Sequence, residues 1–358
     1  MKHILVFGDI EMGAGTVTDD FISDTAFCRV IDSWARRKGA VDLVLNGDTF
    51  DFLKVNDGEY SSRITEKISL RRLGMIERAH ASVFESLKRF AEKRGKRIVF
   101  IIGNHDQDLL FPKVQRRLRS RLGRVVFAEM YKLGGVRIEH GHHHDFLNRW
   151  ERPFRMHAGE RVLNVPFGSA GVLTSYVRLK EEHPFLERIH THHALFQWYP
   201  KMVRKLQMKG FWHVSQVLRA KLFDSTHPIT HLPRGIFKEL YKRWQESDWN
   251  VPDISRYVRS AESARIYVLG HRHKFRVREG KTTVILPDTW RDEYVLDGRT
   301  GRLYPKAKRY VHIIVKGRKH FWKVVTVPVK RSVWSFKDVL KDEQKYLGLA
   351  AKEEKRAG

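Results

Sequence analysis

Cysteine is almost absent from this chain: Cys28 is the single cysteine among 358 residues. One thiol excludes structural zinc sites built on cysteines, and it fits a cytosolic protein, because disulfides persist mainly in oxidising compartments. Long apolar runs are missing too, since the stretch 162–177 is interrupted by asparagine, proline, glycine and serine. A transmembrane helix needs about 18 or more apolar residues, so we expect none.

Acidic residues are too few to balance the basic ones. The chain has 41 Asp and Glu against 68 Lys and Arg, which gives a formal net charge of +27. Such an excess attracts polyanions, so nucleic acid, an anionic membrane and phosphorylated small molecules are all candidate partners. The first predicted strand follows Met1-Lys2-His3 directly, which leaves no room for a signal peptide. We expect a cytoplasmic protein that can contact the inner face of a membrane peripherally.

Five short polar segments occur along the chain, each directly after an apolar run with β-strand character. The segments are Asp9-Ile10-Glu11, Gly47-Asp48-Thr49-Phe50-Asp51, Gly103-Asn104-His105-Asp106, His140-Gly141-His142 and Gly270-His271-Arg272-His273. The apolar runs are residues 4–7, 41–45, 98–102, 136–139 and 266–269. Because active sites in open α/β folds form outside the carboxyl ends of the strands, we expect these polar side chains to converge.

The donor types in these segments indicate a metal centre. Carboxylates, imidazoles and a side-chain amide suit first-row transition ions, whereas an all-oxygen cage would suit Mg or Ca. Two ions about 3.5–4 Å apart can hold a hydroxide nucleophile and a phosphate oxygen together, and such a pair needs a bridging carboxylate. We assign the bridge to Asp48, at the tip of the second strand. The sequence therefore predicts two divalent ions, with Mn first and Fe, Zn or Co as alternatives.

The ordered set of segments resembles the calcineurin-like metallophosphoesterase family, whose pattern is D-x-H, G-D-x-x-D, G-N-H-[DE], a lone His before Gly, and G-H-x-H. The resemblance covers residues 1–145 and 262–330, and it implies an α/β fold with a four-layer α/β/β/α sandwich. It also implies a hydrolase that cleaves a phosphoester or phosphoanhydride with a metal-activated hydroxide. The metal ligands implied by the resemblance are Asp9, Asp48, Asn104, His140, His271 and His273.

Glu11 departs from the family pattern, because it stands where the family has a histidine. A glutamate can bind the same ions, and its charge favours a harder or less Lewis-acidic pair. Alternatively, Glu11 turns away from the metals and Asp19 or Asp20 replaces it. The departure also leaves open another class of function, a non-catalytic binding module that has kept the fold.

His105 is the predicted catalytic imidazole, because it follows the ligand Asn104 and lies near the phosphate. As imidazolium it can stabilise a phosphoryl oxygen or protonate the leaving oxygen. Asp106 is assigned to the catalytic group together with His105. Asp106 and Asp51 are also expected to orient imidazoles, since metal-site imidazoles usually donate their second N–H to a carboxylate or carbonyl. His142 is expected beside the ligands.

The fourth and fifth segments are about 120 residues apart, far more than a βα connection needs. We expect a helical cap over residues 146–262, a catalytic domain over 1–145 and 263–330, and a charged helix or fraying tail over 331–358. Helical spacing of apolar residues begins at Leu195 and is expected to be interrupted by Gly210. In the cap we assign substrate binding to basic and aromatic residues, with core packing of the aromatics as the alternative. These residues are Lys201, Arg204, Lys205, Trp198 and Phe211.

Within the family, the segment 46–52 and the helical insertion are similar to the branch of UDP-2,3-diacylglucosamine pyrophosphohydrolases. That similarity implies a nucleotide-lipid substrate such as UDP-diacylglucosamine. His105 departs from the branch, which has an arginine there. The alternative function is a metal-dependent nuclease or phosphodiesterase, for which the basic surface is the reason and the lack of a recognised nucleic-acid motif is the weakness.

Overall fold

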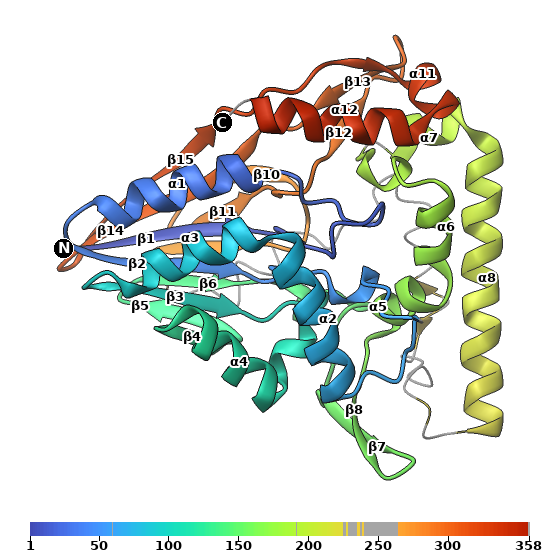
Figure 1. The fold of residues 1–358 in the computed structure, drawn as a ribbon, viewed down its shortest axis with the longest axis horizontal. Coiled ribbons are helices and arrows are strands. Elements are labelled where there is room, and N and C mark those ends of the chain that lie inside the picture. The colour runs from blue at the N-terminus through green and yellow to red at the C-terminus, as the bar shows by residue number, and fades with distance from the viewer. Residues whose placement is uncertain are drawn as a thin grey trace.

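The computed structural model describes residues 1–58, 60–190, 192–224, 227, 235–236, 238–239 and 264–356. A six-stranded sheet has the order β15-β14-β1-β2-β3-β4 (Figure 1). Strands β1 to β4 are parallel, and β14 runs antiparallel to both β1 and β15. The strands are β1 (Lys2–Gly8), β2 (Ala40–Asn46), β3 (Lys96–Ile101), β4 (Val125–Ala128), β14 (Lys308–Lys316) and β15 (Lys319–Val327).

A second, five-stranded sheet has the order β10-β11-β9-β6-β5. Its three central strands are parallel, and each edge strand forms an antiparallel hairpin with its neighbour in the chain. The strands are β5 (Met130–Leu133), β6 (Val136–Glu139), β9 (Ile266–Leu269), β10 (Phe275–Arg278) and β11 (Thr283–Pro287).

The two sheets pack face to face, and helices cover the other face of the larger one. Alternate residues of β1 show this: Ile4 and Val6 belong to the apolar cluster between the sheets, whereas Leu5 and Phe7 face the helices. The helices are α1 (Asp24–Arg36), α2 (Glu66–Ala79), α3 (Ala81–Glu92) and α4 (Pro112–Leu122). The mixed α/β class is as predicted. The fourth layer stays a prediction, since residues 240–263, which precede β9, lie outside the described part of the chain.

The insertion is mostly helical where it is described, but it begins with a β-hairpin, β7 (Phe154–His157) and β8 (Glu160–Leu163). The prediction that Gly210 interrupts a helix is wrong, because α8 continues through it. One glycine in a helix costs only about 1 kcal/mol relative to alanine, which 24 residues of helix can tolerate. The helical elements are α5 (Phe167–Gly171), the π-helical turn η4 (Val172–Tyr176), α6 (Val177–Glu182), the short turn η5 (Leu186–Arg188), α7 (His192–Trp198) and α8 (Pro200–Phe223). The rest of the predicted cap falls largely outside the described residues.

The C-terminal region packs against the body and does not fray within the described residues. A three-stranded sheet of β12 (Tyr294–Leu296), β13 (Arg302–Pro305) and β16 (Trp334–Ser335) leads into α11 (Phe336–Lys341) and α12 (Glu343–Arg356). Ala350 of α12 is fully buried in an apolar cluster with these strands and α7. Glu354 accepts a hydrogen bond from the backbone N–H of Ala26 at 3.0 Å, which ties α12 to α1.

Candidate metal centre

Strained backbone marks the rim where strands of both sheets end. Five of the seven candidate metal ligands have a positive φ: Asp9 (45°), Glu11 (52°), Asp48 (46°), His271 (71°) and His273 (50°). Each such residue costs about 1–3 kcal/mol, and they cluster at functional sites. Glycines allow the close approach of neighbouring segments, because a Cβ at Gly47 would overlap His140 and one at Gly103 would overlap Asp48.

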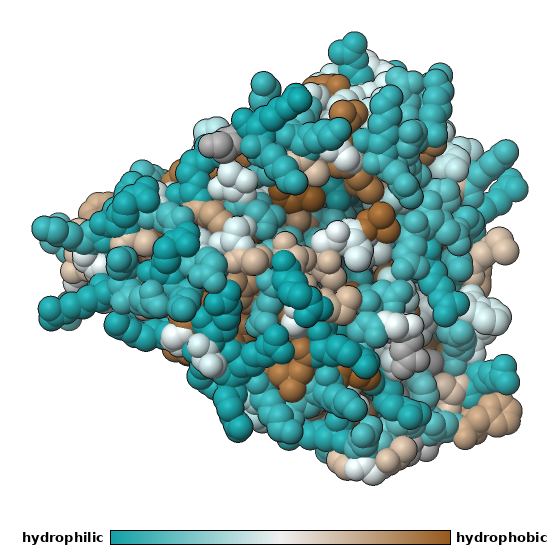
Figure 2. Space-filling view, in the orientation of Figure 1, coloured by the Kyte–Doolittle hydropathy of each residue, from teal (hydrophilic) through white to brown (hydrophobic). Residues whose placement is uncertain are grey.

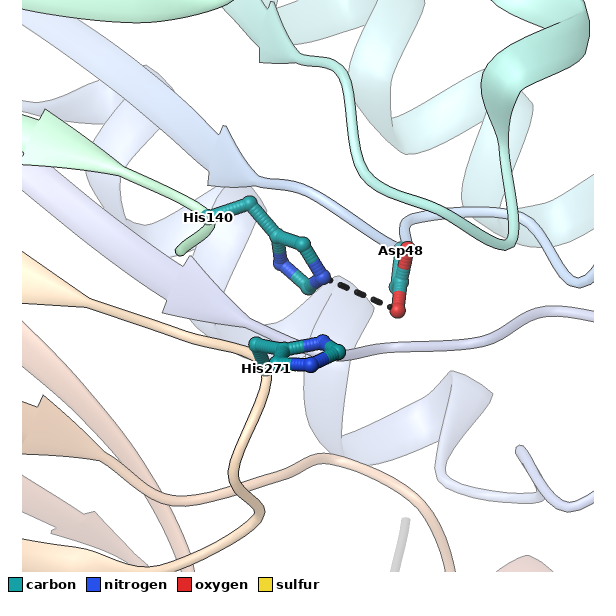
Figure 3. Close-up of side chains that lie close together, drawn as sticks. All are labelled: Asp48, His140 and His271. Carbon is teal, nitrogen blue, oxygen red and sulfur yellow. Dashed lines mark ion pairs between the residues drawn. The ribbon is translucent and has the colours of Figure 1, made fainter. Parts of the chain in front are cut away.

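Asp48, His140 and His271 could hold a metal ion, since one donor atom of each lies within 4.8 Å of the others. Figure 3 shows both imidazole rings extending toward Asp48. His140 Nε2 lies 3.1 Å from Asp48 Oδ2 and 3.2 Å from the amide oxygen of Asn104. His140 Nδ1 lies 3.1 Å from the carbonyl oxygen of Asn46, which fixes the ring. We call Asp48, Asn104, His140 and His271 the Asp48 group.

The electrostatics of the Asp48 group favour positive charge. Burial lowers the pKa of His140, yet the carboxylates of Asp48 and Asp9 outweigh burial and raise it to about 9. Burial raises the pKa of Asp48, but His140 and His105 outweigh it and lower that pKa. A divalent ion would replace the proton on His140, because a ligating imidazole must be neutral. The donors of the Asp48 group fit a first-row transition ion.

Asp9, Glu11 and His273, here the Glu11 group, form a second set of donors. His273 Nε2 lies 3.1 Å from Glu11 Oε1 and 3.5 Å from Asp9 Oδ1. The backbone N–H of His271 donates to both oxygens of Asp9, at 2.9 and 3.1 Å, so Asp9 joins the two groups. Asp9 and His273 belong to the ligand set that the family resemblance implies, and Glu11 stands in the position of the family's histidine. The number and identity of the ions stay predictions.

Glu11 forms ion pairs with two buried cations. Lys54 Nζ lies 3.2 Å from Glu11 Oε2, and Arg291 Nη1 lies 3.4 Å from Oε1. Burial raises the pKa of Glu11, but Arg291 and Lys54 outweigh it and hold that pKa well below its ordinary value. The charge that Glu11 adds to the first segment is therefore balanced inside the protein.

Asp19 and Asp20, the predicted substitutes for Glu11, have other partners. Asp19 Oδ2 lies 2.9 Å from His80 Nε2, and Asp20 Oδ1 lies 2.6 Å from Lys180 Nζ. Asp20, Glu187 and Glu11 do form a third set of close carboxylates. Lys54 Nζ lies within 3.3 Å of all three, so an ammonium group fills that space. The geometry favours Glu11 over either aspartate as the donor beside His273.

His105 is held by Asp51 at the edge of this cluster. Its Nδ1 lies 2.9 Å from Asp51 Oδ1, and its backbone N–H donates to Asp48 Oδ1 at 2.8 Å. Burial lowers the pKa of His105, but the carboxylates of Asp51, Glu11 and Asp48 raise it to about 9. The ring is therefore an imidazolium at neutral pH, and Asp51 lies where an orienting carboxylate was expected.

Asp106 makes other contacts than the catalytic assignment expects. Its carboxylate accepts hydrogen bonds from the backbone N–H groups of Gly103 at 2.6 Å and Thr49 at 2.8 Å. Burial and the neighbouring Asp48 raise its pKa to about 7. Asp106 therefore joins the turns after β2 and β3, and within the described residues no hydrogen bond links it to an imidazole. These contacts support a role for Asp106 in positioning the two turns, and its catalytic role stays a prediction.

His142 lies beside His140, as expected, with their ring centroids 5.3 Å apart. Both nitrogens of His142 are buried and lack a hydrogen-bond partner in the described structure. The ring stacks on Trp150 at a centroid distance of 4.2 Å. Burial and the nearby His140 lower its pKa well below the ordinary value, so this ring is neutral.

The five residues predicted to bind substrate are not brought together at the metal centre. Trp198 packs against the C-terminal sheet, where its indole N–H donates to the carbonyl oxygen of Gly298 at 2.9 Å. The other four lie on α8, where Lys205 pairs with Glu182 at 2.6 Å and Phe211 is 78% exposed. Core packing, the alternative reading, describes Trp198. This geometry gives no support to a substrate-binding role for the five.

Residues outside the five segments complete the site. Asp145 Oδ2 lies 3.0 Å from His271 Nε2, and Glu293 Oε1 lies 2.8 Å from His273 Nδ1. Glu293 and Arg291 follow β11 as the ligands follow their own strands, so the same sequence rule would have found them. Lys54 carries no such signal, because a lysine near a motif is ordinarily exposed.

No family model matches this chain, and a comparison with curated proteins finds no match. The solved structures similar to it include Vacuolar Protein Sorting 29 from Cryptosporidium parvum, which is 12% identical. That match covers 91% of this chain and 97% of the other, with a TM-score of 0.28. A likeness at this level has no bearing on function, so the proposal below depends on the geometry of the site.

Proposed function

We propose that this chain is a metal-dependent phosphohydrolase that cleaves a phosphoester or phosphoanhydride bond. The observation that carries the proposal is the Asp48 group, a carboxylate, an amide and two imidazoles at the rim where two sheets end. Divalent ions held there would supply positive charge for phosphoryl oxygens and lower the pKa of an attacking water. The Glu11 group would hold the second ion of the predicted pair, with Asp48 as the bridge and Mn as the first metal to test.

The protein's own groups have distinct parts in this reaction. His105, held by Asp51, can donate a hydrogen bond to a non-bridging phosphoryl oxygen or a proton to the leaving oxygen. Lys54 and Arg291 are engaged by carboxylates, so they balance charge and do not bind the phosphate. Asp145 and Glu293 orient the two histidines that follow β9.

The substrate proposed first is a phosphoanhydride of a nucleotide-lipid, as the branch resemblance implies. The alternative is nucleic acid, for which the net charge of +27 is the supporting observation. A screen with chromogenic phosphomonoesters and diesters, UDP-linked lipids and single-stranded DNA separates the two.

The test combines metal content with turnover. Asp48→Asn and His140→Gln should each lose bound Mn and lose turnover together, because each removes a donor of the Asp48 group. His3→Gln is the matched control, since His3 lies at the opposite end of β1 from Asp9, and it should keep both properties. Metal-loaded protein that turns over none of the screened substrates would instead support the binding-module reading.

A further inference from the structure

The solvent side of α8 carries a stripe of large apolar side chains. They are Met208 (70% exposed), Phe211 (78%), Trp212 (57%), Leu222 (80%) and Phe223 (82%). At 3.6 residues per turn, all five fall within about 60° of the direction of Met208. The buried residues of α8, Met202, His213 and Val217, point to the opposite side. We call the exposed side the α8 outer face.

The same face is basic. The 24 residues of α8 include six Lys and Arg and no Asp or Glu. Four of these cations fall in the arc of the apolar stripe: Lys201, Arg204, Arg219 and Lys205, of which Lys205 pairs with Glu182 at 2.6 Å. Figure 2 shows white and tan side chains among teal ones along the rim that α8 occupies in Figure 1. The helix therefore presents aromatic and aliphatic groups surrounded by positive charge.

The position of α8 relates this face to the metal centre. The inner side of α8 packs on η4, where His213 Nδ1 lies 2.9 Å from the hydroxyl oxygen of Thr174. In turn, η4 packs on η1 (Phe52–Lys54), which follows the second polar segment. In Figure 1, α8 lies beyond the ends of the parallel strands, on the side of the molecule where the ligands are. A surface bound to the outer face would thus lie on that side.

We propose that the α8 outer face binds an anionic phospholipid surface. Aromatic and aliphatic groups would enter the interface, and the Lys and Arg side chains would reach the headgroup phosphates. Within the described ranges, no helix combines the length and apolar character needed to cross a bilayer, so the contact would be peripheral. A second copy of the chain would bring a second cationic face, and nucleic acid would leave five apolar side chains without a partner, so both fit less well. The inference goes beyond the proposed function.

Vesicle co-sedimentation tests the proposal without using activity. Wild-type protein should bind phosphatidylcholine–phosphatidylserine vesicles and bind phosphatidylcholine vesicles much more weakly. Phe211→Ser with Phe223→Ser should reduce binding by about tenfold or more, through lost apolar burial. Arg204→Gln with Arg219→Gln should reduce it by about fivefold per charge, with a smaller effect at high salt. All four residues are exposed, so thermal unfolding of the variants should match wild type.

Matched controls separate this face from general stickiness. Phe321→Ser removes a half-exposed aromatic from β15, and Arg116→Gln with Arg124→Gln removes two exposed charges elsewhere; both should bind vesicles as wild type does. Equal losses in controls and α8 variants would overturn the proposal. Vesicle binding by the α8 variants at the wild-type level would also overturn it. A loss of self-association in Phe211→Ser with Phe223→Ser would overturn it too, because it would identify a second copy of the chain as the occupant of the face. Because binding needs no turnover, either proposal can fail while the other stands.

Discussion

His105 is the predicted catalytic imidazole, and with Glu11 and Asp51 it also lies in a group of side chains that could hold a metal ion. It lies 2.9 Å from Asp51 and 3.9 Å from Glu11, and its carboxylate neighbours keep it charged. We expect His105→Ala to lower kcat by roughly 10²- to 10⁴-fold, the range for loss of an acid or hydrogen-bond donor, while bound metal is unchanged. Steady-state kinetics on a chromogenic diester, with metal analysis of the same sample, measure both. A variant with wild-type kcat would remove His105 from the mechanism.

Lys54 is placed to compete with a metal ion for Glu11 and Asp51, because its ammonium nitrogen lies 3.2 Å from Glu11 Oε2 and 2.7 Å from Asp51 Oδ2. Lys54→Met should lower the melting temperature of metal-free protein, since it leaves buried carboxylates unpaired, and Mn should restore more stability than it gives the wild type. Metal titration followed by calorimetry should show that Lys54→Met binds the second ion more tightly than the wild type does.

Lys180→Met is the matched control for that experiment. Lys180 pairs with Asp20 and Glu187 in the same buried cluster, and within the described part of the chain it forms no ion pair with Glu11. It should lower stability without improving Mn binding. Identical Mn responses of the two variants would show that Lys54 has no special relation to the metal.

At the scale of elements, His80 ties the junction of α2 and α3 to the start of α1. Its ring lies 2.9 Å from Asp19 and 2.8 Å from Asp24. Burial lowers the pKa of His80, but these carboxylates raise it from 6.5 to about 10. The stabilisation is therefore fully present below about pH 6.5 and is lost as pH rises through about 10, by up to a few kcal/mol. The free energy of unfolding, measured with urea, should fall less between these pH values for His80→Gln than for the wild type. An equal fall in the two proteins would contradict this prediction.

Gly210 offers a test of α8 as an element. Its φ is not positive, and a Cβ at this position would meet no atom within 4 Å apart from its chain neighbours and the backbone of its own helix. Gly210→Ala should therefore raise the free energy of unfolding by about 0.5–1 kcal/mol, measured by urea denaturation. Gly47→Ala should do the reverse, because its φ is +76° and the added Cβ would overlap His140. Destabilisation by Gly210→Ala would mean that the helix is not continuous there.

Strands were the most predictable elements. A strand that is buried on both faces is a continuous apolar run, which can be recognised in the sequence without knowing its neighbours in the sheet. Residues 136–139 and 266–269 were predicted as strands and are β6 and β9 residue for residue. The sequence did not predict that the helix continues through Gly210. The low helix propensity of one glycine can be read from the sequence, but the tertiary packing that outweighs it cannot. At the site, the candidate ligands converge as the strand-end rule predicts. The cations around Glu11 could not be placed, because burial of a lysine depends on carboxylates distant in sequence.

For the molecule as a whole, the net charge of +27 predicts DNA binding that is unrelated to catalysis. Basic residues bind phosphates without sequence preference, and contacts to 6–10 phosphates lose roughly 10³- to 10⁵-fold in affinity between about 50 and 200 mM salt. We expect double-stranded and single-stranded DNA to bind at low salt, to be released as salt rises, and to remain intact with Mn present. Fluorescence anisotropy and a gel assay on the same mixtures check both points. Mn-dependent cleavage that survives in wild type and vanishes in Asp48→Asn would identify a nuclease, and the lipid-phosphate substrate would then be the wrong one.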